Sequence, residues 1–233
     1  MNTLKKVNLK NVTLVAVSSI RVDETLHAME LSMRGIDYHS AILISHEKPE
    51  NLPPGTSFKK CSQINSLDQY SQFIAYELFR YIDSDFALVI QFDGYVLRPH
   101  QWDNAFLEYD YIGAPWLKSL YFTDDGTNVR VGNGGFSLRS KKLLSALNEL
   151  QLPFAKNGTG HYNEDGLICI YYRKALERNG IKFAPVEVAS RFSCEIRCSD
   201  SAEKPFGFHR SKPYTSRLIL VKSFLRNFFR KLS

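Results

Sequence analysis

The sequence feature that most constrains the fold is an alternation of strand-like and helix-like segments in the first half of the chain. Runs of apolar and β-branched residues at 12–18, 41–45 and 86–91 have the length and composition of buried strands. Segments 21–34 and 67–82 carry apolar side chains at the three- and four-residue steps of a helix. This order of elements is typical of a parallel sheet with helices on its faces, so we predict an α/β fold.

Shorter elements complete the predicted fold. The second half of the chain is less regular, with short strand-like runs next to glycines and two further helical periodicities. The additional predicted elements are helices at 141–150 and 163–179 and strands at 59–64, 110–116, 132–139, 182–185 and 186–192. The 233 residues contain no repeat and no low-complexity linker. We therefore predict a single α/β domain over residues 1–215.

The last segment, residues 216–233, differs in composition from the rest of the chain. It carries five Lys or Arg residues and no acidic residue, and its apolar residues recur at helical spacing. We predict a C-terminal basic amphipathic helix that lies on an anionic membrane, with a helix docked on the protein core as the alternative. The five cations in this short segment exclude a membrane span.

The charge balance indicates which partners to expect. A formal net charge of +6 favours phosphorylated small molecules, anionic lipids or nucleic acid. The cations gather in the tail instead of interleaving with aromatic residues, so we do not expect a nucleic-acid partner. The apolar run at 12–17 is too short for a secretory signal or a membrane span. We expect a cytoplasmic protein, held peripherally on the inner face of the cytoplasmic membrane by its tail.

The third strand-like run ends on Gln91-Phe92-Asp93-Gly94, which allows two interpretations. Asp-Gly is common in turns, so a turn alone explains the end of the strand. Open α/β sheets, however, bind ligands beyond the carboxyl ends of their strands. An aspartate carboxylate there is a hard oxygen ligand, suited to Mg²⁺ or Mn²⁺ and hence to a diphosphate.

A glycine-rich segment, Gly132–Leu138, has three glycines in four residues followed by an apolar run. Such a loop can lie flat against a sugar or a phosphate, and a glycine bulge or turn is the alternative. The Gly-Lys-Ser/Thr ending of a phosphate-binding P-loop is absent, and the glycine spacing is wrong for a dinucleotide-binding fingerprint.

Two further segments carry groups capable of chemistry. Asn163, Glu164 and Asp165 precede a predicted helix, where they either cap the helix or present a general base to a hydroxyl group. His209 is a structural histidine or a metal ligand, and Arg210 or Lys212 could pair with phosphate oxygens.

Read in order, these segments resemble a GT-A glycosyltransferase over residues 12–209. The strings YDYIGAPW, at residues 109–116, and VGNGGFSLRS, at residues 131–140, are similar to those of a family of bacterial and fungal glycosyltransferases. The resemblance implies a GT-A fold, a Rossmann-like domain with a mixed, mainly parallel central sheet. It also implies an enzyme that uses a nucleotide-sugar, and it assigns a role to each candidate residue.

By this resemblance, Gln91-Phe92-Asp93 stands where GT-A enzymes carry Asp-x-Asp, with Gln91 in place of the first acid. Asp93 and His209 would bind Mn²⁺ or Mg²⁺, Asp165 would be the catalytic base, and Glu164 would act beside it as an acceptor contact. The implied nucleotide-sugar-binding residues are Ser18, Arg21, Gln91, Asp93, Gly134, Gly135 and Lys212. The implied acceptor-binding residues are Trp116, Asn133 and Glu164.

The resulting functional hypothesis is a metal-dependent, inverting hexosyltransferase in the synthesis of bacterial lipopolysaccharide, O-antigen or capsule. Its donor would be a nucleotide-diphosphate sugar, with uridine as the favoured base, and its acceptor a saccharide or glycolipid. One alternative keeps the fold but makes the protein a metal-dependent nucleotide-sugar hydrolase or a nucleotidyltransferase. Another is a non-enzymatic basic protein that binds nucleic acid or a membrane.

Overall fold

The structure is a computed structural model that describes residues 6–116, 121–122, 128–157, 160–195 and 204–210. Lys212 and the predicted basic helix at 216–233 lie outside these residues, as does the predicted domain boundary at 215.

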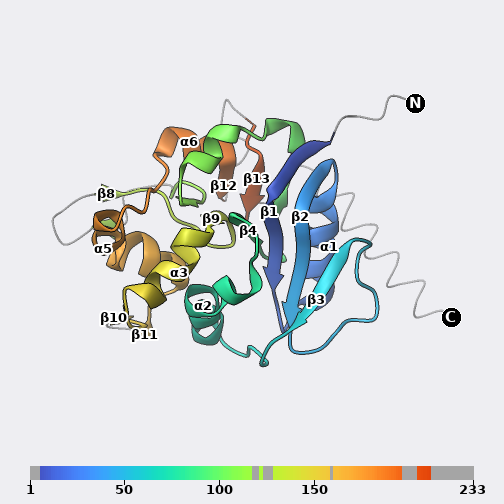
Figure 1. Ribbon diagram of the computed structural model, residues 1–233, viewed down its shortest axis with the longest axis horizontal. Coiled ribbons are helices and arrows are strands. Elements are labelled where there is room, and N and C mark those ends of the chain that lie inside the picture. Colours follow the sequence, from blue (N-terminus) through green and yellow to red (C-terminus); the bar gives the residue numbers. More distant parts are fainter. Residues whose placement is uncertain (1–5, 117–120, 123–127, 158–159, 196–203, 211–233) are drawn as a thin grey trace.

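A six-stranded sheet forms the centre of the molecule, in the order β3-β2-β1-β4-β9-β6 (Figure 1). Strands β1, β2, β3 and β4 run parallel, and β9 is antiparallel to both β4 and β6. The strands are β1 (Val7–Val17), β2 (Ile36–Ser45), β3 (Thr56–Lys60), β4 (Phe86–Ile90), β6 (Tyr111–Ile112) and β9 (Phe136–Ser140). The prediction of a mixed, mainly parallel sheet is confirmed.

Helices cover both faces of the sheet because its central strands are apolar on both sides. On one face, Leu14 and Leu88 pack with Leu26 and Met29 of α1 (Val22–Met33). On the other face, Val15 and neighbouring apolar residues pack against helices on the opposite side of the sheet. Those helices are α2 (Leu67–Tyr76), the 3₁₀ helix η1 (Leu78–Tyr81) and α3 (Lys141–Glu149). Figure 1 shows α1 behind β2, with α2 and α3 to the other side.

Three predictions for the second half are wrong. The predicted strand at 182–185 is only a single bridge between Phe183 and Tyr111. The predicted helix at 163–179 is broken into α4 (Glu164–Gly166), a π-helical turn η4 (Leu167–Tyr171) and α5 (Arg173–Arg178). The predicted strand at 186–192 is the helix α6 (Val186–Phe192). Its alternating pattern resembles a strand, but helical spacing buries Ala189 and Phe192 together. Tertiary packing of these two side chains outweighs the β-propensity of the valines.

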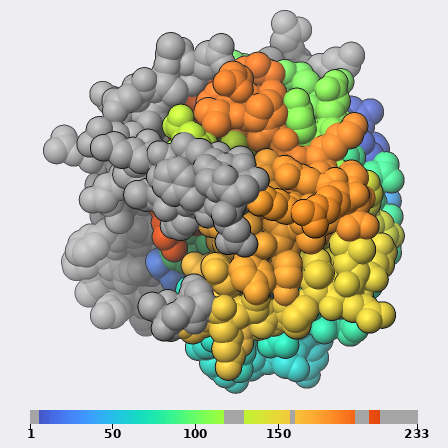
Figure 2. Space-filling model, turned by 90° about the vertical axis from the view of Figure 1, so that its left-hand side faces the viewer, coloured from blue at the N-terminus to red at the C-terminus, as the bar shows by residue number. Residues whose placement is uncertain are grey.

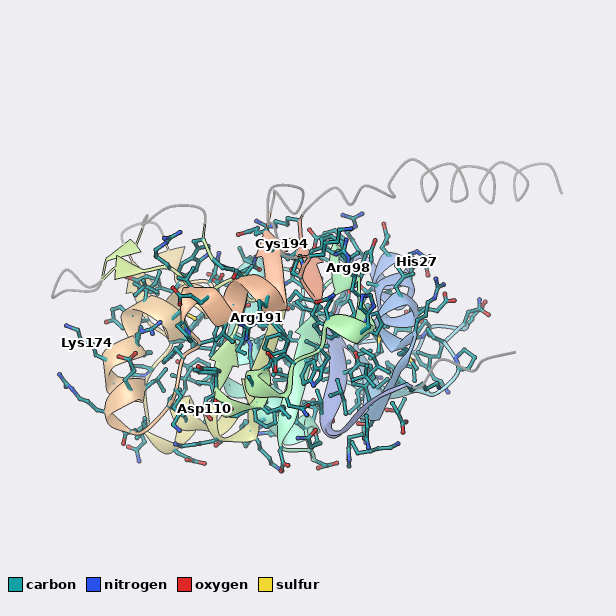
Figure 3. The ribbon with its side chains drawn as sticks, turned by 90° about the horizontal axis from the view of Figure 1, so that it is seen from above. His27, Arg98, Asp110, Lys174, Arg191 and Cys194 are labelled. Atoms are coloured by element: carbon teal, nitrogen blue, oxygen red, sulfur yellow. The ribbon has the colours of Figure 1, made fainter. Side chains whose placement is uncertain are left out.

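The remaining elements are short. The 3₁₀ helices are η2 (Pro99–Gln101) and η3 (Asn104–Glu108). The short strands are β5 (Gly94–Val96), β7 (Tyr121–Phe122), β8 (Asn128–Val129), β10 (Lys156–Asn157), β11 (Gly160–His161), β12 (Ser193–Glu195) and β13 (Gly207–His209). Asp110, labelled in Figure 3, links the segment before α6 to strand β9. Its carboxylate accepts hydrogen bonds from the Ser140 hydroxyl at the end of β9 and from the Lys182 backbone N–H.

A second, three-stranded sheet joins segments that are far apart in the sequence. Its order is β12-β13-β5, and it places His209 beside Gly94 on one side and beside Glu195 on the other. Beneath it, Phe192 of α6 packs against Phe106, Phe136 and Phe206, with ring centroids 5.2–5.9 Å apart. In Figure 2 a small red patch, from residues 204–210, is visible on this face of the molecule. This small sheet positions the candidate site.

Candidate active site at the carboxyl end of the fourth strand

The segment after β4 is both a turn and part of a site. The Gly94 N–H donates to the Gln91 carbonyl at 3.1 Å, which closes the turn that Asp-Gly predicts. Gly94 then begins β5 and pairs with His209. The two interpretations of Asp93 are therefore compatible, because the turn brings its carboxylate to the imidazole of His209.

The side chain of His209 is buried at the centre of the site. Its Nε2 lies 3.3 Å from Asp93 Oδ1 and 3.2 Å from Gln91 Oε1. Its Nδ1 lies 3.9 Å from Glu195 Oε1. The fold thus brings together His209, Gln91 and Asp93, as the sequence predicts, and adds Glu195, which sequence reasoning missed.

We tested whether these groups fit a divalent cation. Adjacent ligands of an octahedral ion with bonds of about 2.1 Å lie about 3 Å apart, close to the 3.2 and 3.3 Å separations at His209 Nε2. The buried Asp93 Oδ1 makes no hydrogen bond among the described residues. Within those residues, no group of three or more His, Cys, Asp or Glu side chains could hold a metal by itself. The groups fit an ion that takes its other ligands from a substrate.

The two carboxylates beside His209 have opposite pKa shifts. Burial disfavours the charge on Asp93, but its pairing with His209, a local backbone N–H and Arg210 outweigh burial. The pKa of Asp93 therefore lies below its usual value. Burial raises the pKa of Glu195, and the charges of His209 and Arg210 only partly offset this shift.

The glycines of the segment 132–135 leave room for protein side chains. A methyl group at Gly135 would overlap the imidazole of His209, and one at Gly134 would overlap the Glu164 carboxylate. A methyl group at Gly132 would overlap the indole of the half-buried Trp116. These close approaches explain why this segment needs glycine. Contact of Gly134 and Gly135 with a sugar stays a prediction.

Asn133 has an unusual place in the same segment. Its φ of 64° is left-handed, its side chain is buried, and neither amide atom has a hydrogen-bond partner among the described residues. Asparagine tolerates this conformation better than most residues. A buried amide without partners calls for an explanation, and a polar ligand in the site would supply one.

The two acidic residues that begin α4 have different surroundings. Glu164 is 4% exposed, and its Oε1 lies 3.3 Å from Nη2 of the fully buried Arg139. This buried ion pair gives Glu164 a structural role, and its contact with an acceptor stays a prediction. Asp165 is half-buried, and its Oδ2 accepts a hydrogen bond from Gly134 N at 3.3 Å.

The loop after β1 also reaches this edge of the sheet. Arg21, exposed at the start of α1, places its guanidinium 3.8 Å from the ring centroid of Phe92. Ser18, half-buried, donates its backbone N–H to Ile44 at the end of β2. Arg21 is therefore next to the Gln91–Asp93 turn, as a diphosphate-binding residue would be.

Unpaired buried polar atoms gather around the same site. Besides Asp93 and Asn133, the Tyr70 hydroxyl is buried and makes no hydrogen bond of good geometry among the described residues. Burial raises the pKa of Tyr70, the charge of Glu164 adds to this shift, and a polar contact with Gln91 opposes it, so this hydroxyl lies among the site residues. Such clustering is expected where a ligand completes the hydrogen bonding.

Sequence reasoning missed Glu195, Arg139 and Tyr70. An arginine within the otherwise apolar and small-residue strand β9 was a usable signal, because buried arginines need partners. Tyr70 follows the helical periodicity of α2 and resembles a core residue. Glu195 lies in a three-residue strand that carries no sequence signal.

The fold is similar to that of solved glycosyltransferases. The galactosyltransferase LgtC, solved with donor and acceptor sugar analogues, is 14% identical, with a TM-score of 0.52 over 86% of this chain and 87% of that one. The apo-form glycosyltransferase GlyE of Streptococcus pneumoniae TIGR4 is 12% identical, with a TM-score of 0.47 over 87% of this chain. This chain spans 55% of the length of GlyE. The likeness to LgtC shows that the chain has a glycosyltransferase-type fold.

The chain belongs to the family described as "Protein of unknown function (DUF5672)", whose model matches residues 54–209. The match includes β4, the glycine-rich segment, α4 and His209. Comparison with curated protein sequences yields no match. Among the described residues, no helix has both the length and the apolar character needed to cross a membrane.

Proposed function

We propose that this protein is a metal-dependent, inverting glycosyltransferase that moves a sugar from a nucleotide-diphosphate donor to a hydroxyl group of a saccharide or glycolipid. The observation that supports it best is the buried Asp93 Oδ1, 3.3 Å from His209 Nε2, at the ligand-binding edge of a glycosyltransferase-type fold.

The donor would lie across the carboxyl ends of β1 and β4. Asp93 and His209 would hold Mn²⁺ or Mg²⁺, which would stabilise the negative charge on the departing diphosphate. The Gln91 side-chain amide would hydrogen-bond the ribose or a metal-bound water. Arg21 beside the turn, and Lys212 outside the described residues, would pair with phosphate oxygens. Uridine is the base that we propose for the donor.

The transfer step requires a base next to the acceptor. In this proposal the Asp165 carboxylate takes the proton of the acceptor hydroxyl, whose oxygen bonds to the anomeric carbon as the carbon–oxygen bond to the diphosphate breaks. The nucleotide diphosphate leaves and the configuration inverts. Asn133 and Trp116 would orient the sugars, because an amide can pair with hydroxyl groups and an indole can stack on a sugar ring.

We also propose that the acceptor is a glycolipid on a membrane surface. A basic amphipathic tail at 216–233 would hold the enzyme on an anionic membrane, where glycolipid acceptors of bacterial surface polysaccharides are built. Deleting the tail should weaken binding to anionic liposomes without reducing nucleotide binding.

A direct test is product analysis with a panel of nucleotide-sugars, Mn²⁺ and candidate saccharide acceptors. A glycosyltransferase releases nucleotide diphosphate faster when the acceptor is present and forms a glycoside of inverted configuration, which NMR identifies. Equal release without acceptor would indicate a hydrolase, and release of pyrophosphate a nucleotidyltransferase. Retained configuration would contradict the inverting mechanism, as would full transfer by a folded Asp165→Asn variant.

A further inference from the structure

The buried charge pair of Arg139 and Glu164 raises a question that the proposed function leaves open. Arg139 is fully buried in β9, and its only ion-pair partner among the described residues is Glu164. Burying two charges costs several kcal/mol per ion, and apolar residues of similar size often serve stability as well. Stability alone therefore does not explain why two charged side chains are buried at this position.

The contacts of Arg139 connect it to the glycine-rich segment. Its Nε donates to Ser137 Oγ at 3.0 Å, and that hydroxyl donates to the Gly134 carbonyl at 3.0 Å. Its Nη2 lies 3.5 Å from the same carbonyl and 3.3 Å from Glu164 Oε1. One guanidinium thus contacts the segment and the start of α4 together.

The next contact in this network is Asp165. The Gly134 N–H donates to Asp165 Oδ2 at 3.3 Å, and the Gly166 N–H donates to Asp165 Oδ1 at 2.8 Å. Both oxygens of the carboxylate are therefore held, one by the glycine-rich segment and one by its own helix. The direction of the carboxylate depends on the position of Gly134, which Arg139 and Glu164 set.

Glu164 itself is held from a third element. Its Oε2 accepts a hydrogen bond from Ser71 Oγ of α2 at 3.5 Å. Burial raises the pKa of Glu164, with the neighbouring Asp165 acting in the same direction and Arg139 opposing both. Removing the Arg139 cation alone would leave this carboxyl buried without a counter-charge.

We propose that Arg139 and Glu164 are positioning residues: by holding the Gly134 carbonyl they fix the backbone of Gly134, whose N–H orients the Asp165 carboxylate. This inference rests on the proposed function for the role of Asp165, but its structural part does not. The planar guanidinium fork matters here, because a lysine ammonium at the same place cannot contact Ser137, Gly134 and Glu164 at once.

Two variants separate positioning from plain stabilisation. The Arg139→Met/Glu164→Met pair removes both charges and keeps apolar volume, so it should unfold at a urea concentration near that of the wild type. Arg139→Lys keeps the positive charge but loses the planar guanidinium. It replaces the double variant in both measurements if the double variant does not fold. Glu177→Gln removes a carboxylate from an exposed ion pair with Arg173 and is the surface control.

The first readout is independent of activity. Amide hydrogen exchange at Gly134, followed by NMR, should become at least tenfold faster in the double variant and in Arg139→Lys, and stay unchanged in Glu177→Gln. Unchanged exchange at Gly134 in a folded variant would overturn the inference, whatever the reaction turns out to be.

The second readout is a comparison of kcat and KM. Both folded variants should lose at least tenfold in kcat for transfer, with KM for the nucleotide-sugar within about threefold of wild type. Wild-type kcat in the folded double variant would overturn the positioning role. A wild-type protein without any nucleotide-sugar turnover would instead refute the proposed function, and the exchange measurement would still decide the structural part.

Discussion

His209 Nε2 lies 3.3 Å from Asp93 Oδ1, although the two residues are far apart in the sequence. The antiparallel pairing of β13 with β5 produces this contact, since it sets His209 directly beside Gly94. Four predictions concern this site and the residues packed around it.

Gly135→Ala should destabilise the fold and disrupt the site, because the added methyl group would overlap the His209 imidazole. Overpacking of this kind costs about 1–3 kcal/mol of unfolding free energy. Gly166→Ala is the matched control, since a methyl group there meets only the Tyr162 ring at 3.4 Å, within helix α4. Urea unfolding should show a loss for Gly135→Ala and a change of less than about 1 kcal/mol for Gly166→Ala.

Phe192→Ala should be strongly destabilising, by about 3–5 kcal/mol, because Phe192 is fully buried among three aromatic rings under the small sheet. Leu67→Ala provides the comparison, since Leu67 is 58% exposed and should change stability by less than about 0.5 kcal/mol. A small effect of Phe192→Ala in urea unfolding would mean that α6 does not pack as described.

Glu195→Gln should change the pH dependence of stability. Burial raises the pKa of Glu195, so above the unfolded value of about 4.3 the folded chain binds more protons than the unfolded chain. Its contribution to stability therefore falls as the pH rises through the window between the two pKa values. The stability of wild type relative to Glu195→Gln should decrease from about pH 4 upwards in metal-free urea unfolding. A difference that grows with pH would refute this assignment.

Arg21→Ala should weaken nucleotide binding more than it weakens the fold. The exposed stack of Arg21 on Phe92 contributes about 0.5–1 kcal/mol to stability. If Arg21 pairs with a donor phosphate, its loss should reduce nucleotide affinity about tenfold, which corresponds to roughly 1.4 kcal/mol. Arg34→Ala, at the other end of α1 in an exposed pair with Glu30, is the control in calorimetric titrations. Equal affinities for the two variants would remove Arg21 from the donor site.

Much of this architecture was predictable from local patterns. The strands of the first half are predictable from their apolar runs, and α1 and α2 from apolar residues at helical spacing. The turn at Asp93 is predictable from the Asp-Gly pair. Because ligands bind beyond the carboxyl ends of parallel strands, Asp93 was expected at this edge, whereas Ser18 and Arg21 were assigned to it by the resemblance to glycosyltransferases.

The remainder depends on long-range contacts. Val186–Phe192 has the alternation of a strand, and only the aromatic cluster of Phe106, Phe136 and Phe206 makes it a helix. Glu195 reaches His209 through the pairing of two three-residue strands, which no local pattern encodes. The Arg139–Glu164 pair likewise joins β9 to α4 through space, so no local pattern shows that Glu164 pairs with a buried arginine.

The central claim is that Asp93 and His209 bind a metal together with a nucleotide diphosphate, and one measurement tests it most directly. Thermal unfolding is followed with uridine diphosphate and other nucleotide diphosphates, each with Mn²⁺ and with EDTA. The comparison is between wild type, Asp93→Asn and the exposed-residue control Asp85→Asn.

Ligands that bind only the folded state raise the melting temperature. We predict a rise that requires both a nucleotide and Mn²⁺, is lost in Asp93→Asn and is retained in Asp85→Asn. A folded wild-type protein with no such rise for any nucleotide, or an equal rise in Asp93→Asn, would contradict the claim.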